Sequence, residues 1–253
     1  MPEPRPLAVQ LYTLREEAQA DLEGTLERVG AIGFVGVEPA DLHGLSPAAF
    51  RERVESLGMT VCSSHGMPIG DTAGQVLDDA VTLGSPLVVV PFAAPDRFKT
   101  IEGVHAVADE LNAALPLAQE RGLALGYHNH FWEWRKLPDG RAAFDAMLDR
   151  LDPGVVLELD VYWAQVAGQD PVALLERLGA RAARLHMKDG PADAPEAAMT
   201  AAGDGKVDLA AAAAASPAAW HIVELDRCDT DMFEAVERSY AYLTSQGISS
   251  GRH

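Results

Sequence analysis

The segment Tyr127–Trp134, with the sequence YHNHFWEW, gathers two histidines, an amide, a carboxylate and several aromatic rings within a short stretch. Imidazole nitrogens and carboxylate oxygens bind divalent metals, and both groups transfer protons near neutral pH. Aromatic rings beside such groups either stack on sugar rings or cover a pocket. The segment therefore indicates metal-binding or acid–base chemistry, provided that polar side chains from elsewhere in the chain meet it.

Polar residues of the same kinds stand at the ends of other short apolar runs. They are Glu38, His65, Asp160, His186, Lys188, Glu224 and Asp226. Because side chains two residues apart on a strand point the same way, the residues of neighbouring parallel strands sort into levels. One level holds His128, Asp160, His186 and Glu224, and the level nearer the solvent holds His130, Tyr162, Lys188 and Asp226. Two imidazoles and two carboxylates that converge from four strands predict a divalent-metal site at the first level.

Structural roles compete with ligation at each of these positions. A single polar residue at the end of a strand is more often a cap, a salt bridge or a solvated tip than a ligand, whereas four that converge favour a site. One level deeper, Glu158 and Arg184 fall at matching depth on neighbouring strands. We expect these two to form a buried ion pair beneath the site.

These residues need a fold that brings the ends of consecutive strands together, and the chain has the pattern of one. Amphipathic segments alternate with short apolar runs, and a glycine often separates the two, as at Gly33 and Gly84. A glycine suits the left-handed position that ends a helix. Eight strands are expected, at residues 7–12, 34–38, 59–65, 85–91, 123–130, 155–160, 180–187 and 220–226, followed by a last helix through Phe233 and Leu243.

Eight β/α units predict a single (β/α)8 TIM barrel that spans residues 1–253. A doubly wound open sheet is the alternative, but no glycine-rich phosphate loop follows the first strand, where the sequence reads QLYTLREEA. In a TIM barrel the active site lies at the carboxyl ends of the strands, where the polar residues described above are found.

Composition excludes several other classes of protein. A net charge of −18 disfavours binding to a nucleic-acid backbone, which needs clustered Lys and Arg. The sequence lacks a signal-peptide layout and any apolar run long enough for a membrane span, so we expect a cytoplasmic protein without membrane contact. In that compartment the two cysteines, Cys62 and Cys228, are expected to stay reduced.

Several segments resemble one known family in their order and spacing. They are VQLYTLR, GVE, YHNHFWEW, ELDVYWAQVAGQDP, LHMKD, GDGKVD and VELDRCD, and they extend from about residue 7 to residue 243. Together they resemble the xylose isomerase-like TIM barrels of the sugar phosphate isomerase/epimerase superfamily. That group includes sugar isomerases and epimerases, inosose and 3-dehydroshikimate dehydratases, and a DNA-repair endonuclease.

The resemblance implies one divalent metal ion, often Mn, Mg, Co or Zn, held by Glu, Asp, His and Glu at the ends of the fifth to eighth strands. Carried over, these places fall on His128, Asp160, His186 and Glu224. Two positions depart from the pattern. His128 stands where many relatives have Glu, a feature of a subgroup with YHNH at this strand. Trp163 stands where many epimerases have a histidine.

The expected chemistry is metal-assisted enolisation of a sugar or keto-polyol. Glu224 is the expected base, and Lys188 and His130 are candidates for stabilising or protonating the substrate oxygen. Substrate contacts are expected from Glu38, His65, Trp132 and Trp163, although the tryptophans also suit a role as cover for the barrel mouth. The expected partner is therefore a small-molecule carbohydrate. The few basic residues at the strand ends disfavour a phosphate group on it, but the sequence leaves phosphorylation of the substrate open.

Other functions and the oligomeric state stay open on the sequence. Elimination of water from a keto-inositol or keto-sugar passes through the same kind of intermediate as isomerisation. A metal-dependent hydrolase would use two or three ions, and a non-catalytic sugar-binding protein would keep the aromatic rings without a metal. A homo-oligomer is compatible with the sequence.

Overall fold

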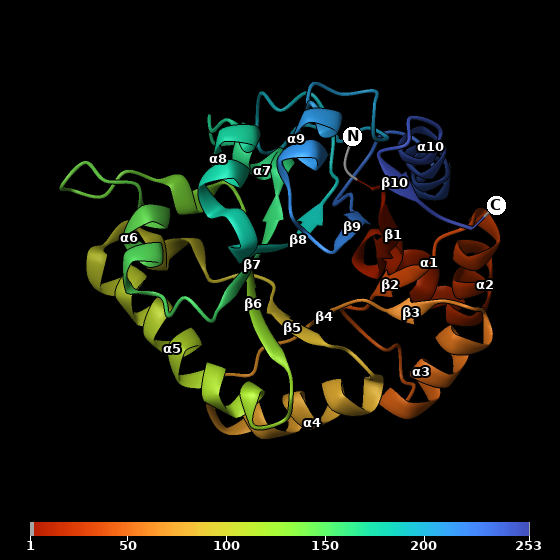
Figure 1. Ribbon diagram of the computed structural model, residues 1–253, viewed down its shortest axis with the longest axis horizontal. Helices are drawn as coiled ribbons and strands as arrows, with labels where there is room; N and C mark the ends of the chain where they lie inside the picture. The colour runs from red at the N-terminus through yellow and green to blue at the C-terminus, as the bar shows by residue number, and fades with distance from the viewer. Residues whose placement is uncertain (1–2, 253) are drawn as a thin grey trace.

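Parallel strands alternate with helices and form a nearly closed barrel in the computed structural model, which describes residues 3–252 (Figure 1). The strands are β1 (Arg5–Gln10), β2 (Gly36–Glu38), β3 (Thr60–Val61), β4 (Ser64–His65), β5 (Leu87–Val90), β6 (Ala124–His128), β7 (Val156–Asp160), β8 (Ala182–His186), β9 (Trp220–Val223) and β10 (Ser249–Ser250). Their order around the barrel is β3-β2-β1-β9-β8-β7-β6-β5-β4. This arrangement confirms the predicted TIM barrel.

The third predicted strand, residues 59–65, is divided into β3 and β4. Cys62 and Ser63 separate the two pieces, yet the backbone still bonds to β2, since Cys62 N donates to Val37 O at 3.0 Å. On the other side β4 pairs with β5, with His65 opposite Val89. This short segment therefore closes the barrel between β2 and β5. A strand absent from the prediction, β10, pairs with β1 near its start.

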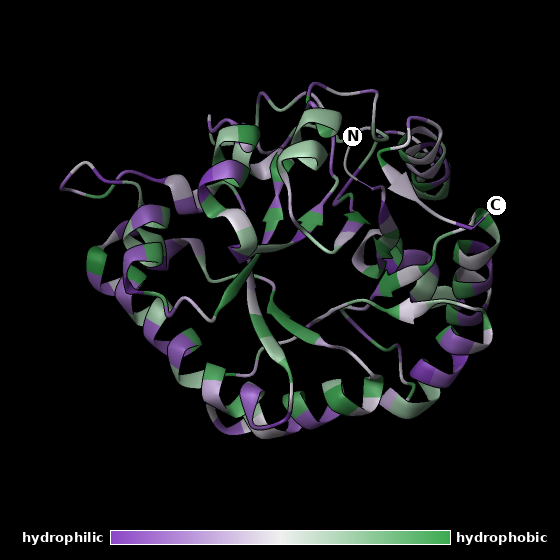
Figure 2. Cartoon of the chain, in the orientation of Figure 1, coloured by the Kyte–Doolittle hydropathy of each residue, from purple (hydrophilic) through white to green (hydrophobic). Residues whose placement is uncertain are grey.

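Ten α-helices of the described chain surround the strands (Figure 1). They are α1 (Arg15–Ala20), α2 (Leu22–Ile32), α3 (Pro47–Ser56), α4 (Ala73–Leu83), α5 (Ile101–Gln119), α6 (Ala143–Arg150), α7 (Val161–Val166), α8 (Pro171–Leu178), α9 (Leu209–Ala215) and α10 (Met232–Ser245). Figure 2 shows mostly hydrophobic residues along the strands and mixed faces on the helices. Burial of the strands on both faces is typical of a parallel sheet covered by helices.

The helix α2 illustrates how the sequence sets the local structure. Its N-cap Asp21 accepts a hydrogen bond from Gly24 N, and Leu22, Leu26 and Val29 are buried. The helix ends at Gly33, whose φ of 118° lies in the left-handed region. A side chain at this position would also overlap the Tyr240 hydroxyl, so glycine is needed on two counts. Among residues 3–252, no helix has the length and apolar character needed to span a bilayer.

Candidate active site

Polar side chains meet at the carboxyl ends of β6 to β9, where TIM barrels carry their active sites. The strand register explains which ones meet. Asp160 on β7 is opposite His186 on β8, as the counting of levels predicts. His128 on β6, however, is opposite Glu158, and His186 is opposite Ile222 on β9. The strands are therefore staggered, as closure of a barrel requires, and Glu158 reaches the level of the site.

Glu158 lies at the centre of a deep cluster of imidazoles. Its Oε2 atom is 2.8 Å from His65 Nε2, 3.1 Å from His186 Nε2 and 3.4 Å from His128 Nδ1. A second carboxylate, Glu38, contributes Oε2 at 3.1 Å from His186 Nε2. Both carboxylates are fully buried. The three histidines and two glutamates thus form one buried polar network at the base of the site.

The predicted ion pair between Glu158 and Arg184 is wrong. The two residues are register partners on β7 and β8, but their side chains take different directions. Arg184 Nη2 donates to the Cys62 carbonyl at 2.7 Å, at the point where the barrel closes. Glu158 is instead neutralised by the imidazoles of the deep cluster. Equal depth on neighbouring strands does not ensure contact between two side chains.

An upper cluster surrounds the ammonium of Lys188. Its Nζ atom lies 2.9 Å from Asp160 Oδ2, 2.8 Å from Glu224 Oε2 and 2.7 Å from Asp226 Oδ2. Glu224 Oε2 also lies 2.8 Å from His186 Nδ1, so His186 connects the upper cluster to the deep one. Burial alone would lower the pKa of Lys188, but Asp160, Asp226 and Glu224 outweigh it and hold that pKa well above its ordinary value.

Two overlapping sets of side chains have the chemistry of a metal site. His128, Asp160, His186 and Glu224, the set predicted from the sequence, place one ligand atom each within 4.8 Å of one another. His65, His128, Glu158 and His186 meet the same condition. His128 Nδ1 and Glu158 Oε1 are buried and without a hydrogen-bond partner, which is costly unless a cation compensates it. Nitrogen and oxygen donors together suit Zn, Mn or Co, so the residues fit a divalent metal ion.

Protonation of the site follows from these contacts. Burial raises the pKa of Glu224, but Lys188 and His186 outweigh that effect and hold the pKa well below its ordinary value. The Glu224 carboxylate is therefore ionised at neutral pH. Burial lowers the pKa of His186, whereas Glu158 and Glu224 raise it well above its ordinary value. A metal that binds His186 must therefore displace a proton.

The structure explains the composition of the YHNHFWEW segment. The Asn129 side chain clamps the tip of β7, accepting from Asp160 N at 3.0 Å and donating to Asp160 O at 3.2 Å. Glu133 accepts from the Tyr127 hydroxyl at 2.8 Å and from His130 N at 3.0 Å, and burial raises the pKa of Glu133 to about 8. Asn129 and Glu133 thus hold the loop that presents His128 and His130.

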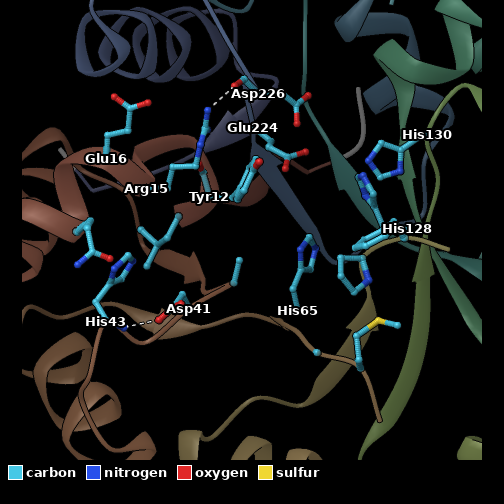
Figure 3. A pocket seen from close by; sticks show the side chains of 17 residues that line it. Tyr12, Arg15, Glu16, Asp41, His43, His65, His128, His130, Glu224 and Asp226 are labelled. Carbon is cyan, nitrogen blue, oxygen red and sulfur yellow. Dashed lines mark hydrogen bonds between the residues drawn. The ribbon is translucent and has the colours of Figure 1, made fainter. Parts of the chain in front are cut away.

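A cavity of about 980 Å³ opens onto this site (Figure 3). His65, His128, His130 and Glu224 line its inner part. Its outer part is lined by residues that follow β1, β2, β4 and β5, among them Tyr12, Arg15, Asp41, Met67 and Phe92. Figure 3 shows His128 and His130 across the cavity from Tyr12 and Arg15. The cavity therefore joins the polar cluster to a second, more exposed region.

The remaining residues expected at the site lie behind this lining. Glu38 is buried beneath His65 and His186. The ring of Trp132 stacks on His130 with 4.1 Å between centroids, and its Nε1 donates to Ala93 O. Trp163 is buried, with its ring centroid 5.2 Å from Lys188 Nζ. Asp160, His186 and Lys188 are likewise buried.

Sequence reasoning missed the outer lining of the cavity and the central place of Glu158. The outer residues follow the ends of the first strands, and this position in a TIM barrel is a usable signal. Glu158 stands two residues before Asp160, so it faces the same side of β7. That spacing is a signal for its entry into the site.

Comparisons with known proteins agree with the fold. The model of the xylose isomerase-like TIM barrel family matches residues 26–215. A sugar phosphate isomerase/epimerase from Parabacteroides distasonis superposes with a TM-score of 0.83 at 24% identity, covering 98% of this chain and 96% of that one. Because the identity is low, this likeness concerns the fold.

Two curated relatives match part of the sequence. Inosose dehydratase from Geobacillus kaustophilus is 25% identical over 190 residues, which are 65% of this chain and 60% of the relative. The 2-epi-5-epi-valiolone 7-phosphate 2-epimerase from an Actinoplanes species is 31% identical over 156 residues, which are 61% of this chain and 54% of the relative. The matched part thus spans little more than half the length of either relative.

The family match covers most of the chain, and the polar cluster lies at the carboxyl ends of the strands, where TIM barrels carry their active sites. The protein belongs to the xylose isomerase-like TIM barrel family.

Proposed function

We propose that the protein is a divalent-metal-dependent isomerase that enolises a sugar or a keto-polyol. The observation that carries this proposal is the convergence of His128, Asp160, His186 and Glu224, whose ligand atoms lie within 4.8 Å of one another. Glu224 and His128 also line the cavity, so a bound small molecule would reach them. A buried set of nitrogen and oxygen ligands beside a cavity is the arrangement that metal-assisted proton abstraction requires.

His128, Asp160, His186 and Glu224 would hold the metal ion. When bound, the ion supplies positive charge that acidifies the carbon next to a carbonyl group. Asn129 fixes the backbone of Asp160, and Asp160 Oδ1 accepts from Trp163 N at 2.9 Å, so this ligand is held from both sides. Such supporting contacts orient a ligand before the ion arrives.

Glu224 is the proposed base. It is ionised at neutral pH because Lys188 and His186 stabilise its charge, and it lines the cavity. Lys188 maintains the charge balance among Asp160, Glu224 and Asp226 and supplies positive charge near the substrate oxygen. Burial, with His128, lowers the pKa of His130 well below its ordinary value, so His130 is a neutral hydrogen-bonding partner for a substrate hydroxyl.

Proton transfer is proposed on one face of the substrate. Two-base epimerisation needs a carboxylate on each face, and the strand that holds His128 offers an imidazole at the place of one of them. Glu133 on the same segment already accepts hydrogen bonds from the Tyr127 hydroxyl and from His130 N, so it is not a candidate for the second base. Glu224 is therefore the base on one face, as aldose–ketose isomerisation or elimination requires.

Dehydration of a keto-inositol or keto-sugar is the second candidate. The similarity to inosose dehydratase supports it, since elimination of water can start from the same proton abstraction. Because the chain is also similar to an epimerase, epimerisation is a third outcome that the experiment must detect.

The test is exchange of substrate hydrogen with solvent. The purified protein, loaded with Mn and then separately with Zn, is incubated in D₂O with a panel of aldoses, ketoses and inososes, and each mixture is followed by NMR. Isomerisation predicts deuterium at the carbon next to the carbonyl group together with an aldose or ketose product. Formation of an unsaturated ketone would favour the dehydratase, and efficient inversion at one carbon of a ketose would contradict transfer on one face.

A further inference from the structure

The cavity extends well beyond the polar cluster. Its volume of about 980 Å³ lies near the upper end of the range of about 300–1,000 Å³ typical of sites for drug-sized ligands. The inner part, with His128, His130 and Glu224, is where the proposed function places the sugar ring. The outer part, beyond His65, remains for something attached to that ring.

Large apolar side chains are exposed at the outer part. Tyr12, Met67 and Phe92 have exposed fractions of 44%, 42% and 48%, and all three line the cavity. In the described part of the chain, the other large apolar side chains exposed to this degree are Val81 at 45% and Leu117 at 37%. Those two lie on α4 and α5, away from the cavity. Exposed apolar groups gathered in one cavity indicate a ligand that covers them.

The three side chains are held in place by the barrel. Met67 and Phe92 follow β4 and β5, which are neighbours in the sheet, and Gly66 N donates to Val89 O at 2.9 Å. Tyr12 follows β1, and the Arg15 guanidinium lies 4.4 Å from its ring centroid. Arg15 in turn donates to Tyr12 O at 2.8 Å and to Asp226 O at 2.9 Å. The backbone that carries Met67 and Phe92 is thus fixed by the barrel, and Tyr12 is held by Arg15.

We propose that the outer part of the cavity binds an aromatic substituent, so that the substrate is a sugar or keto-polyol joined to an aryl group. This inference rests on the proposed function for the position of the sugar ring. The rings of Tyr12 and Phe92 offer faces and edges for a flat ring, and the Met67 thioether makes favourable contacts with aromatic edges. Met67 and Phe92 have no side-chain donor for the hydroxyls of a second sugar. Because Arg15, Gln19 and Asp41 of the same lining can bond hydroxyls, a disaccharide is the competing ligand in the test.

Calorimetric titration of the metal-loaded protein tests the proposal without turnover. The ligands are methyl β-glucoside, phenyl β-glucoside and cellobiose, which share one ring and differ in what is attached to it. The phenyl compound should bind about tenfold more tightly than the methyl compound, as expected for burial of one ring. Phe92→Ala and Tyr12→Ala should each remove a few-fold of that preference and leave methyl glucoside affinity unchanged.

Val81→Ala and Leu117→Ala are matched controls, because they remove equally exposed apolar groups outside the cavity. They should leave all three affinities unchanged. Equal affinities for the phenyl and methyl compounds, no binding of either, or tighter binding of cellobiose would overturn the proposal. Light scattering of the wild-type protein and of Phe92→Asp adds a further check. A wild-type dimer that becomes a monomer in the variant would show that a second copy covers this surface, and would overturn the proposal.

Enolisation and the aryl subsite can each be contradicted without the other. If the phenyl compound binds with the expected preference but no sugar derivative exchanges hydrogen with D₂O, the aryl subsite stands and enolisation is wrong. If a bare ketose exchanges hydrogen while the aryl preference is absent, enolisation stands and the aryl subsite is wrong.

Discussion

The two halves of the barrel mouth differ in how their side chains are held. From β6 to β9, His128, Asp160, His186, Lys188 and Glu224 are at most 4% exposed. Ion pairs join the last four of them to one another. From β1 to β5, the lining side chains Tyr12, Met67 and Phe92 are more than 40% exposed. Removing the partner of a buried charge lowers the free energy of unfolding, whereas removing an exposed ring leaves no buried group unpaired. Substitutions in the first half should therefore affect chemistry and stability, and those in the second half binding alone.

The largest effect is expected at Glu224, the proposed base. Glu224→Gln keeps the size of the side chain but cannot accept the substrate proton, so hydrogen exchange should fall by about 10²–10⁴-fold. The rate is measured by NMR in D₂O with metal content checked in each sample. The control is Glu237→Gln, an exposed carboxylate on α10. Exchange that survives in the Glu224 variant would remove this residue from the mechanism.

Lys188→Met should change stability and metal binding in opposite directions. Loss of the ammonium leaves Asp160, Glu224 and Asp226 without their common partner, and the free energy of unfolding without metal should fall by about 3 kcal/mol. Divalent-metal affinity should rise, because the ammonium no longer competes for Asp160 and Glu224. Urea unfolding in EDTA and metal titration check the two parts. Weaker metal binding in this variant would contradict the competition.

Asp160→Asn and Glu158→Gln distinguish the two overlapping metal sets. Asp160 belongs only to the upper set and Glu158 only to the deep set. Replacement of Asp160 should weaken metal binding by at least about 100-fold, more than the loss of an outer-shell partner. Replacement of Glu158 should have the smaller effect. Metal affinity is measured by competition with a chromogenic chelator, and the reverse order would move the ion to the deep set.

The smallest effect concerns the outer face of β9. His221 is buried beside Ser249 of β10, at 2.8 Å from its hydroxyl, and burial, with Arg5, lowers the pKa of His221 to about 4. Between pH 6.5 and pH 4 the unfolded chain binds a proton that the folded chain excludes, so stability is present above this window and is lost as pH falls. By pH 5 this histidine should cost about 2 kcal/mol of stability.

His221→Asn should remove that pH dependence and leave hydrogen exchange unchanged, because His221 faces away from the Glu224 side of the strand. Urea unfolding at pH 7 and pH 5 measures the difference. An identical loss of stability in the variant would assign the acid effect to other groups.

The sequence predicted the barrel well because its pattern is local. Each apolar run and each helix-ending glycine reports on its own segment, and β6, β7, β8 and β9 lie within their predicted ranges. The break at Cys62 and Ser63 and the added strand β10 were missed. The break depends on how the barrel closes, and β10 depends on pairing with the start of β1. The local pattern records neither.

The site was predictable in part. Counting by twos along the strands brought Asp160 opposite His186, as the structure has them. The same counting placed Glu158 opposite Arg184, and the register agrees. It did not record where the side chains go, since Arg184 donates to the Cys62 carbonyl instead of reaching Glu158. Tyr12, Met67 and Phe92 were missed because the paths of loops decide which side chains line a cavity, and loops have no periodicity.

The most direct test of the proposed chemistry at the ends of β6 to β9 is the position of a bound metal ion. A crystal of the protein grown with Mn, measured near the Mn absorption edge, locates the ion by its anomalous signal. We expect one peak within bonding distance of His128, Asp160, His186 and Glu224. A peak held instead by His65 and Glu158, or no peak among these side chains, would contradict it.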